Sequence, residues 1–313
     1  MTPAPQVLEK SQSLKRPLVM GIINATPDSF YSQSRSFSPP IAANNAFRFL
    51  EEGADIIDLG GESTRPGSEP ISLQEELDRV LPVLELLKNF PVPISIDTQK
   101  AEVAKQARLL GAAILNDISA LRFDRGMIKE ALHFKSVILM HRGGESPKTM
   151  QANPVYADAV REVYSFLEER KNFFIQSGGK AEQVLVDPGI GFGKALSHNL
   201  EIFSHLQEFS KVAPVIVGAS RKGFIGKIRP DLGPEERMPG SIAVACWAAL
   251  QKAAIVRVHD VSATVRALEV WRAFDQASRD IDRQKDALLD DISRRLEQKL
   301  EEKPLFTLRW RLL

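Results

Sequence analysis

The sequence predicts an α/β fold, a (β/α)8 TIM barrel, and three observations support this prediction. Short runs rich in Val and Ile recur eight times, and each is followed by a polar or glycine-containing turn and then by a helical pattern. The runs are uniformly apolar rather than alternating, which is typical of parallel strands buried on both faces. Eight such units in about 260 residues fit a closed barrel better than a doubly wound sheet of five or six strands.

The eight predicted strands are, in chain order, LVMGIIN (18–24), ADIIDLGGE (54–62), PISIDT (93–98), AAILNDI (112–118), SVILMH (136–141), VLVDPG (184–189), PVIVGAS (214–220) and AIVRVHD (254–260). Helical patterns connect them. The first, PIAANNAFRFLEEG, is expected to end at Gly53, and KAEVAKQARLLG at Gly111. Ser72 is the predicted N-cap of the helix that follows it.

The chain divides into three predicted segments. Residues 1–16 are an N-terminal tail, residues 17–277 form a single barrel domain, and residues 278–313 form a charged C-terminal helical extension. The extension has Ile and Leu at helical spacing among many charges, so it is predicted to be an amphipathic helix. Its role is either that of a solvated helix or that of a subunit contact.

Composition argues against several classes of function. The 41 basic and 40 acidic side chains leave a net charge of +1, so nothing in the overall charge favours nucleic acid. Cys246 is the one cysteine, in an apolar helical pattern, and is expected to be a small buried residue rather than part of a disulfide. The chain shows neither a signal-peptide pattern nor an apolar run of about 18 residues. We therefore expect a soluble, cytoplasmic protein with no membrane partner.

Residues that an apolar core would not choose lie at the carboxyl end of every predicted strand. They are Asn24, Asp58, Asp97, Asn116, Asp117, Met140 with His141, Asp187, Lys222, Arg257, His259 and Asp260. In a barrel these ends share one face, where active sites are assembled. Some of these residues, taken singly, could have a local structural role: Asp97, Asn116 and Asp117 could cap helices, and Asp187 could set a turn. Such local roles do not account for eight polar ends together.

Two weaker motifs predict no separate site. DPGIGFGK lacks the Walker spacing because Ala195 follows Lys194, so its glycines are expected to let the backbone approach a flat ligand, with Phe192 covering it. His198 and His205 do not form a HExxH pattern, and they are interpreted as surface or core histidines rather than zinc ligands.

Two long signatures stand out, GIINATPDSF at 21–30 and DLGGESTRPGS at 58–68. SIDT, NDI, DPGIGFGK, GASRKGFIG and RVHDV follow in order. With these motifs the chain resembles the dihydropteroate synthases, transferases of the pterin-binding barrel superfamily, over roughly residues 17 to 270. That family joins p-aminobenzoate to 6-hydroxymethyl-7,8-dihydropterin diphosphate in folate biosynthesis, with release of pyrophosphate.

The resemblance implies a role for each matching residue. Asp97, Lys222 and Arg257 would be catalytic. The pterin would contact Asp97, Asn116, Met140, Asp187, Gly218, Lys222 and Arg257. The diphosphate would contact Asn24, Arg65, Arg257 and His259, with Mg²⁺ held by Asn24. The p-aminobenzoate would contact Thr64, Arg65, Pro66, Phe192 and Ser220. A homodimer and inhibition by sulfonamides are also implied.

The chemistry of these residue types agrees with such roles. A carboxylate such as Asp187 can accept from the adjacent N–H and amine of a pterin, and Lys222 can donate to the ring carbonyl. Arg65, Arg257 and His259 would stabilise charge on a leaving diphosphate, so we expect a dissociative displacement by a neutral aniline nitrogen. The loop NATPDSFYSQSRSF (24–37) would close with GGESTRPGS over the site and exclude water.

Two alternatives stay open. A pterin-barrel methyltransferase acting from methyltetrahydrofolate to a corrinoid would share the Asp and Asn contacts, but has no use for ESTRPGS and SRK. A non-catalytic pterin-binding protein would not need Arg65, Lys222 and Arg257. The chain departs from the family pattern in YSQSRSF, which lacks the usual glycines, and in the bulky Arg142.

Overall fold

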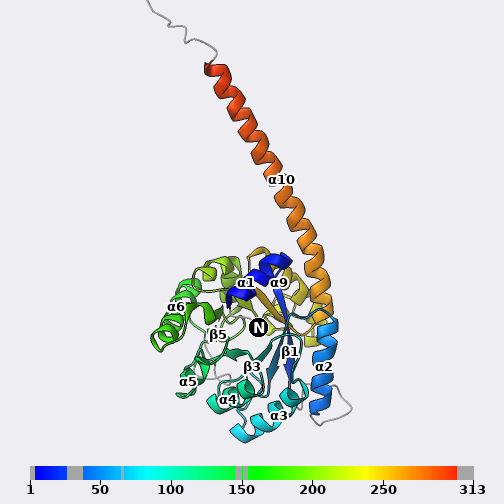
Figure 1. Cartoon of the computed structure of the whole chain (residues 1–313), viewed down its shortest axis with the longest axis vertical. Helices are drawn as coiled ribbons and strands as arrows, with labels where there is room; N and C mark the ends of the chain where they lie inside the picture. Colours follow the sequence, from blue (N-terminus) through cyan, green and yellow to red (C-terminus); the bar gives the residue numbers. More distant parts are fainter. Residues whose placement is uncertain (1–3, 27–37, 65–66, 145–149, 151–153, 302–313) are drawn as a thin grey trace, which may run out of the picture. The chain divides into compact units, whose positions relative to one another are not determined.

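Eight parallel strands form the centre of the molecule in the computed structural model, which describes residues 4–26, 38–64, 67–144, 150 and 154–301 (Figure 1). The strands are β1 (Leu18–Asn24), β2 (Ile56–Gly60), β3 (Ile94–Asp97), β4 (Ile114–Asp117), β5 (Ser136–Met140), β6 (Val184–Asp187), β7 (Ile216–Val217) and β8 (Ile255–Val258). Their order is β6-β5-β4-β3-β2-β1-β8-β7. A parallel bridge from Val186 to Val215 joins the two outer strands. The predicted (β/α)8 barrel is confirmed.

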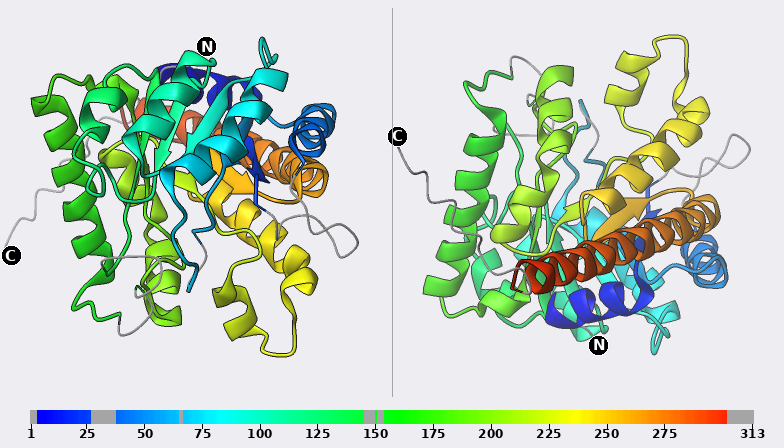
Figure 2. Two further views of the ribbon diagram at one scale, coloured as in Figure 1. Left: turned by 90° about the horizontal axis from the view of Figure 1, so that it is seen from below. Right: turned by 90° about the horizontal axis from the view of Figure 1, so that it is seen from above.

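In residues 1–268, helices lie around the strands (Figure 2). The described helices of the whole chain are α1 (Ala4–Leu14), α2 (Pro39–Glu51), α3 (Leu73–Leu86), α4 (Ala101–Leu109), α5 (Met127–Ala131), α6 (Ala159–Gln176), α7 (Leu196–Ser204), α8 (Gly223–Ile228), α9 (Met238–Leu250) and α10 (Val261–Glu301), with 3₁₀ turns η2 (Ala181–Gln183), η3 (Leu206–Lys211) and η4 (Pro234–Arg237). Cys246, expected to be buried, is only half-buried on α9. Among the described helices, none is both long enough and apolar enough to cross a membrane.

The predicted helix signals correspond to observed ends. The Ser72 side chain accepts from the backbone N–H of Glu75 at 3.1 Å, as an N-cap does. Gly53 and Gly111 follow α2 and α4 with φ of +94° and +105°, a conformation that costs glycine little. These stops turn the chain back toward the next strand.

Side chains inside the barrel form layers. Residues two apart on a strand point to the same face. Most strands therefore give an apolar residue to a lower layer and, two residues later, a residue to a layer nearer the carboxyl end. The lower layer is apolar and buried: Leu18, Met20, Ile56, Ile114, Ile138, Leu185, Ile216 and Ile255. Two residues further along the strands lie Asp58, Asn116, Met140, Asp187, Gly218 and Arg257. The polar strand ends therefore share one end of the barrel.

Helix α1 packs against the lower layer. Val7 is fully buried in the same cluster as Leu18 and Ile56. Arg16 and Lys10 pair with Asp55 at 2.8 and 3.0 Å. Residues 4–14, expected from the sequence to belong to a tail, are thus a helix, because the apolar floor of the barrel provides a surface that covers Val7.

The chain separates into two units, Met1–Leu268 and Glu269–Leu313. The described part of the second unit is a continuous helix, since α10 runs from Val261 to Glu301. The helix therefore begins before residue 278, where the charge pattern of the sequence placed the start of the extension.

Candidate active site

Arg257 lies between two buried carboxylates at the carboxyl end of the barrel. Its Nε donates to Asp58 Oδ2 at 2.5 Å, and a terminal guanidinium nitrogen donates to Asp97 Oδ2 at 2.8 Å. The Asn116 amide also donates to Asp58 Oδ2, at 3.2 Å. Strands β8, β2, β3 and β4 thus supply one connected polar network, in which one guanidinium bridges two carboxyl groups.

The strand register explains why these groups meet. Asp97 lies opposite Asn116 on β4 and opposite Gly60 on β2. A Cβ on Gly60 would lie 3.5 Å from the Asp97 Cβ, which is an ordinary van der Waals contact. Because side chains two residues apart on a strand point to the same face, Asp58 lies on the same side of β2 as Gly60.

Asp97 and Asp58 each have one oxygen without a hydrogen-bond partner among the described residues. Both atoms, Oδ1 in each case, are buried. Burial raises the pKa of Asp97, while the charge of Arg257 acts in the opposite direction. A buried acceptor without a donor costs about 1–3 kcal/mol, so these atoms are ready to accept from a bound ligand.

Asp187 at the end of β6 begins the glycine-rich turn. Its Oδ1 accepts from Gly189 N–H at 2.7 Å, and its carbonyl accepts from His141 N–H at 2.9 Å. Burial raises the pKa of Asp187, and the charge of Lys222 opposes that shift. A Cβ on Gly218 would lie 3.7 Å from Asp187 Oδ2 and 3.6 Å from Arg257 Cδ, so this position is in contact distance of both side chains.

Lys222 precedes α8 and reaches across to the same turn. Its Nζ donates to the Ile190 carbonyl at 2.6 Å and lies 4.3 Å from the centroid of the Phe192 ring. Burial lowers the pKa of Lys222 to about 8, and the charge of Asp187 limits the fall. An amine with this pKa changes its number of donors within the ordinary working range of pH.

The turn after Asp187 is held from below by a buried lysine. Lys194 Nζ is 2.8 Å from His141 Nδ1 and 2.9 Å from the Gly189 carbonyl. Gly189 has φ of +70°, and a Cβ there would lie 1.8 Å from the His141 carbonyl oxygen, which excludes any other residue. Burial and the charge of Lys194 lower the pKa of His141 well below its usual range. Burial also lowers the pKa of Lys194, to about 7, and the two side chains share this hydrogen bond.

An apolar wall completes this side. Ile118, Met140, Met150 and Phe192 form one buried cluster. Phe192 is only 9% exposed, so its ring is fixed by packing. Such a wall suits a flat, partly apolar ring more than a sugar or a peptide.

Ser220 and His259 lie together after β7 and β8. Ser220 Oγ is 3.1 Å from His259 Nδ1 and accepts from the His259 backbone N–H at 3.2 Å. Arg221 pairs with Asp260 at 2.6 Å and fixes the two turns to each other. An imidazole and a hydroxyl beside Arg257 can donate to an anion.

The loop after β2 is anchored at its base. Lys100 Nζ contacts Glu62 Oε2 at 2.5 Å and the fully buried Glu76 at 2.6 Å. Thr64 is half-buried beyond Glu62. The predicted aminobenzoate residues Arg65 and Pro66, and loop residues 27–37, lie outside the described residues.

The Asn24 side chain is the predicted protein ligand of Mg²⁺. Within the residues that the structure describes, no group of three or more His, Cys, Asp or Glu side chains could hold a metal ion. Asn24 is half-buried at the end of β1, opposite Gly60. One amide oxygen fits Mg²⁺, which commonly keeps water and takes most other ligands from substrate phosphates.

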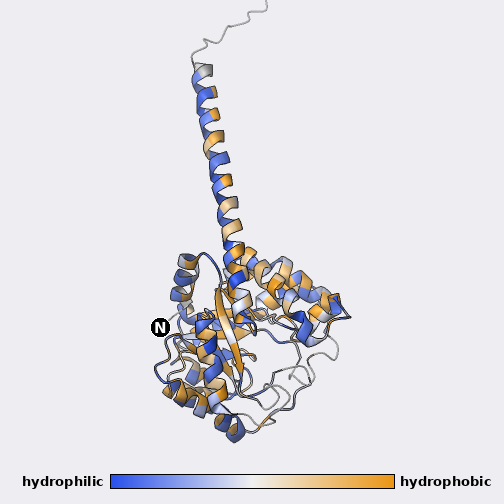
Figure 3. Cartoon of the chain, turned by 90° about the vertical axis from the view of Figure 1, so that its right-hand side faces the viewer, coloured by the Kyte–Doolittle hydropathy of each residue, from blue (hydrophilic) through white to orange (hydrophobic). Residues whose placement is uncertain are grey.

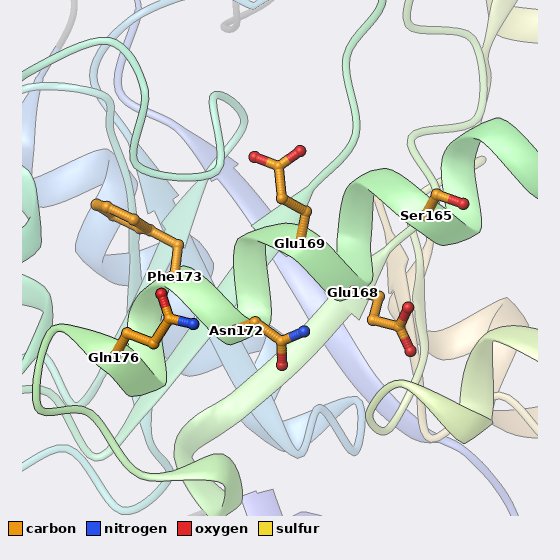
Figure 4. A pocket seen from close by; sticks show the side chains of 6 residues that line it. All are labelled: Ser165, Glu168, Glu169, Asn172, Phe173 and Gln176. Carbon is orange, nitrogen blue, oxygen red and sulfur yellow. The ribbon is translucent and has the colours of Figure 1, made fainter.

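One hollow on the surface is separate from this network. It is lined by Ser165, Glu168, Glu169, Asn172, Phe173 and Gln176, which all belong to α6 (Figure 4). None of these residues follows a strand end, so the hollow is not part of the candidate site.

Known proteins share both the sequence and the architecture of this chain. A family model for pterin binding enzymes matches residues 20–259. The dihydropteroate synthase of Haemophilus influenzae is 43% identical over 270 residues, which cover 86% of this chain and 98% of that protein. The chain belongs to the dihydropteroate synthase family. The resemblance found in the motifs is thereby confirmed.

Solved dihydropteroate synthases have the same fold. The enzyme of Yersinia pestis, in complex with a sulfonamide drug, has a TM-score of 0.78 and 42% identity, and the match covers 84% of this chain and 96% of that one. The enzyme of Burkholderia cenocepacia, complexed with 7,8-dihydropteroate, has a TM-score of 0.77 and 42% identity, with coverage of 85% and 94%.

The structure brings most predicted residues into one region, although their roles stay predictions. Asp97, Asn116, Met140, Asp187, Gly218 and Arg257 lie at or just after the carboxyl ends of strands. Lys222 contacts Phe192 and the turn after Asp187, and Ser220 and His259 pair with each other after β7 and β8. Sequence analysis placed Asp58 among the polar strand ends but gave it no particular role, and it gave none to Lys100 or Lys194.

Proposed function

We propose that this chain condenses 6-hydroxymethyl-7,8-dihydropterin diphosphate with p-aminobenzoate, giving 7,8-dihydropteroate and pyrophosphate for folate biosynthesis. The observation that supports it most is the Asp58–Arg257–Asp97 network, with Asp187 and Lys222 at the same end of the barrel. Membership of the family agrees with it, as does the related enzyme solved with 7,8-dihydropteroate.

The pterin would lie across the polar layer. Asp187 would accept from the ring N–H and the exocyclic amine, and Lys222 would leave the Ile190 carbonyl to donate to the ring carbonyl. The unpartnered Asp97 Oδ1 would accept a further ring N–H. With Met140 and Phe192 as the wall and Arg257 stacked on the ring, each polar group of a pterin would gain a partner.

The diphosphate would be directed toward the cations and hydroxyls near β1, β7 and β8. Arg257 and His259 would donate to its oxygens, together with Arg65. Mg²⁺ held by the Asn24 amide oxygen and by diphosphate oxygens would neutralise charge on the leaving group. These contacts would strengthen as the negative charge grows.

We propose a dissociative displacement. The bond between the pterin methylene carbon and the diphosphate oxygen breaks, and its electron pair leaves with pyrophosphate. The cation is delocalised into the pterin ring, where the carboxylate of Asp97 stabilises it. The lone pair of the neutral aniline then forms the C–N bond, and the extra proton passes to water.

The p-aminobenzoate would bind beside the loop after β2, against Thr64, Arg65, Pro66, Phe192 and Ser220. Phe192 would serve both substrates because its ring lies between Lys222 and the apolar wall. The Lys100–Glu62 pair would keep the base of that loop in place.

The direct test is formation of 7,8-dihydropteroate from the two substrates with Mg²⁺, followed together with pyrophosphate release. Wild type is expected to form both products in equal amounts, and Lys222→Ala to be much slower. Transfer of a methyl group from methyltetrahydrofolate to a corrinoid, with no dihydropteroate, would instead support the methyltransferase. Tight pterin binding without either product would support a non-catalytic binding protein.

A cytoplasmic location is part of the proposal, in keeping with the single cysteine, Cys246. Action as a homodimer likewise stays a prediction of the family resemblance.

A further inference from the structure

The second unit contains an internal repeat of eleven residues. Its three blocks are EVWRAFDQASR (269–279), DIDRQKDALLD (280–290) and DISRRLEQKLE (291–301). Each block begins with an acid, continues with Val or Ile, and has Arg at the fourth position and an acid at the seventh. The repeat begins after residue 259, where the family match ends. The barrel reaction therefore does not account for it.

An eleven-residue period has a definite meaning on a helix. Eleven residues make three turns with about 20° left over, so equivalent positions form rows nearly parallel to the axis. The second, sixth and ninth positions fall on one such row. Its members with described side chains are Val270, Phe274, Ala277, Ile281, Lys285, Leu288, Ile292 and Leu296. We call this set the apolar row. Lys285 is the one charged member of the set, and in the sequence Lys299 occupies the ninth position of the third block.

The apolar row is exposed in the single chain. Phe274 is 73% exposed, Leu288 59% and Ile281 51%. In Figure 3 hydrophobic turns recur between hydrophilic ones along α10. Helices in proteins gain most of their stability by packing an apolar face, so a row of this length indicates a missing partner.

The charges around the row favour a second copy of the chain. The first-position acids, Glu269, Asp280 and Asp291, lie on one side of the row, and Asp282, at the third position of the middle block, lies on the other. Lys285 inside the row would meet edge carboxylates of an identical helix. A second copy also presents a row of the same period and length, which is the match that long helical pairs require.

A membrane surface fits the segment less well. Residues 269–301 contain nine acidic and seven basic side chains. Helices that lie on anionic bilayers have a polar face rich in Lys and Arg, whereas acids border this row on both sides.

We propose that residues 269–301 form a self-association helix, which pairs along the apolar row with the same segment of a second copy of this chain. The pairing is separate from catalysis, because no residue of the candidate site lies in this segment. Its failure would leave the proposed function untouched.

The test measures molar mass of the full chain by light scattering over a range of concentrations. Ile281→Glu combined with Leu288→Glu places two charges in the row. The matched control, Ala287→Glu combined with Ser293→Glu, adds the same charges at exposed positions outside it. The row variant is expected to hold about half as many copies as wild type, as loss of one two-fold contact requires, and the control as many as wild type.

Circular dichroism and enzyme activity check that both variants keep the fold of the barrel. Equal masses for wild type and the row variant at every concentration would overturn the proposal. A second outcome would also overturn it. In that outcome wild type keeps the same molar mass at every concentration and binds vesicles of phosphatidylcholine and phosphatidylserine, whereas the row variant does not bind them.

Discussion

Arg257 donates through Nε to Asp58, a carboxylate with no exposed surface, at a distance of 2.5 Å. The two residues are far apart in sequence, on β8 and β2, and meet because the barrel makes their strands near neighbours on either side of β1. The same guanidinium reaches Asp97. Asp58 therefore positions a cation that the proposed reaction uses.

Asp58→Ala is expected to destabilise the protein by about 3–5 kcal/mol, because it leaves Arg257 buried with one of its two counter-charges removed. Denaturant unfolding measures this change. The double variant Asp58→Ala with Arg257→Met should lose less unfolding free energy than the sum of the losses in the two single variants. Asp275→Ala breaks the more exposed pair with Arg279 and should cost less than about 1 kcal/mol. Additive losses at Asp58 and Arg257 would contradict the coupling.

The pKa of Lys222 predicts a pH dependence. Since the pKa of Lys222 is lowered to about 8, the side chain is charged below that pH and loses a donor proton above it. The kcat/KM for the pterin substrate reports groups of the free enzyme, so it should fall as pH rises through about 8. Lys222→Arg keeps its charge and should lack this fall, whatever its absolute rate. The same descending limb in both enzymes would show that another group is titrating.

Lys194→Met removes the donor that holds the glycine-rich turn. It leaves the Gly189 carbonyl and His141 Nδ1 without their partner and should cost about 1–3 kcal/mol of stability. Pterin affinity, measured by calorimetry, should fall as well, because Asp187 and Phe192 flank this turn. Lys171→Met, which loses one bond to the Val212 carbonyl, is the control and should leave pterin affinity unchanged. Equal affinities in the two variants would remove Lys194 from the site.

Lys100→Met is expected to act on the other substrate. Glu76 would be left buried without its cation, and Glu62 would no longer anchor the loop after β2. The KM for p-aminobenzoate should rise more than the KM for the pterin, which binds elsewhere. Lys105→Met, at an exposed lysine paired with Glu102, should change neither constant. A uniform rise in both KM values would point to general destabilisation.

The barrel and much of the site follow from the sequence because both depend on local signals. Uniform apolar runs marked the strands, and Asp97, Asn116, Asp187 and Arg257 stand at their carboxyl ends, which share one face of a barrel. The helix start at Ser72 was also a local signal.

Contacts between distant segments could not be predicted in this way. Lys194 appeared in the sequence as part of a failed phosphate motif, and only the fold shows that it is buried against His141. Helix α1 has few apolar residues, and its packing depends on the floor that other strands create. The roles of Arg65 and Pro66 stay predictions from the family resemblance.

The most direct test of the site is a crystal structure of the full chain soaked with 6-hydroxymethyl-7,8-dihydropterin. The pterin is expected at the carboxyl end of the barrel, with its N–H and amine within hydrogen-bond distance of Asp187 and its carbonyl facing Lys222. A pterin bound in the hollow on α6, or one that leaves the partners of Asp97 and Asp187 unchanged, would contradict the proposed site.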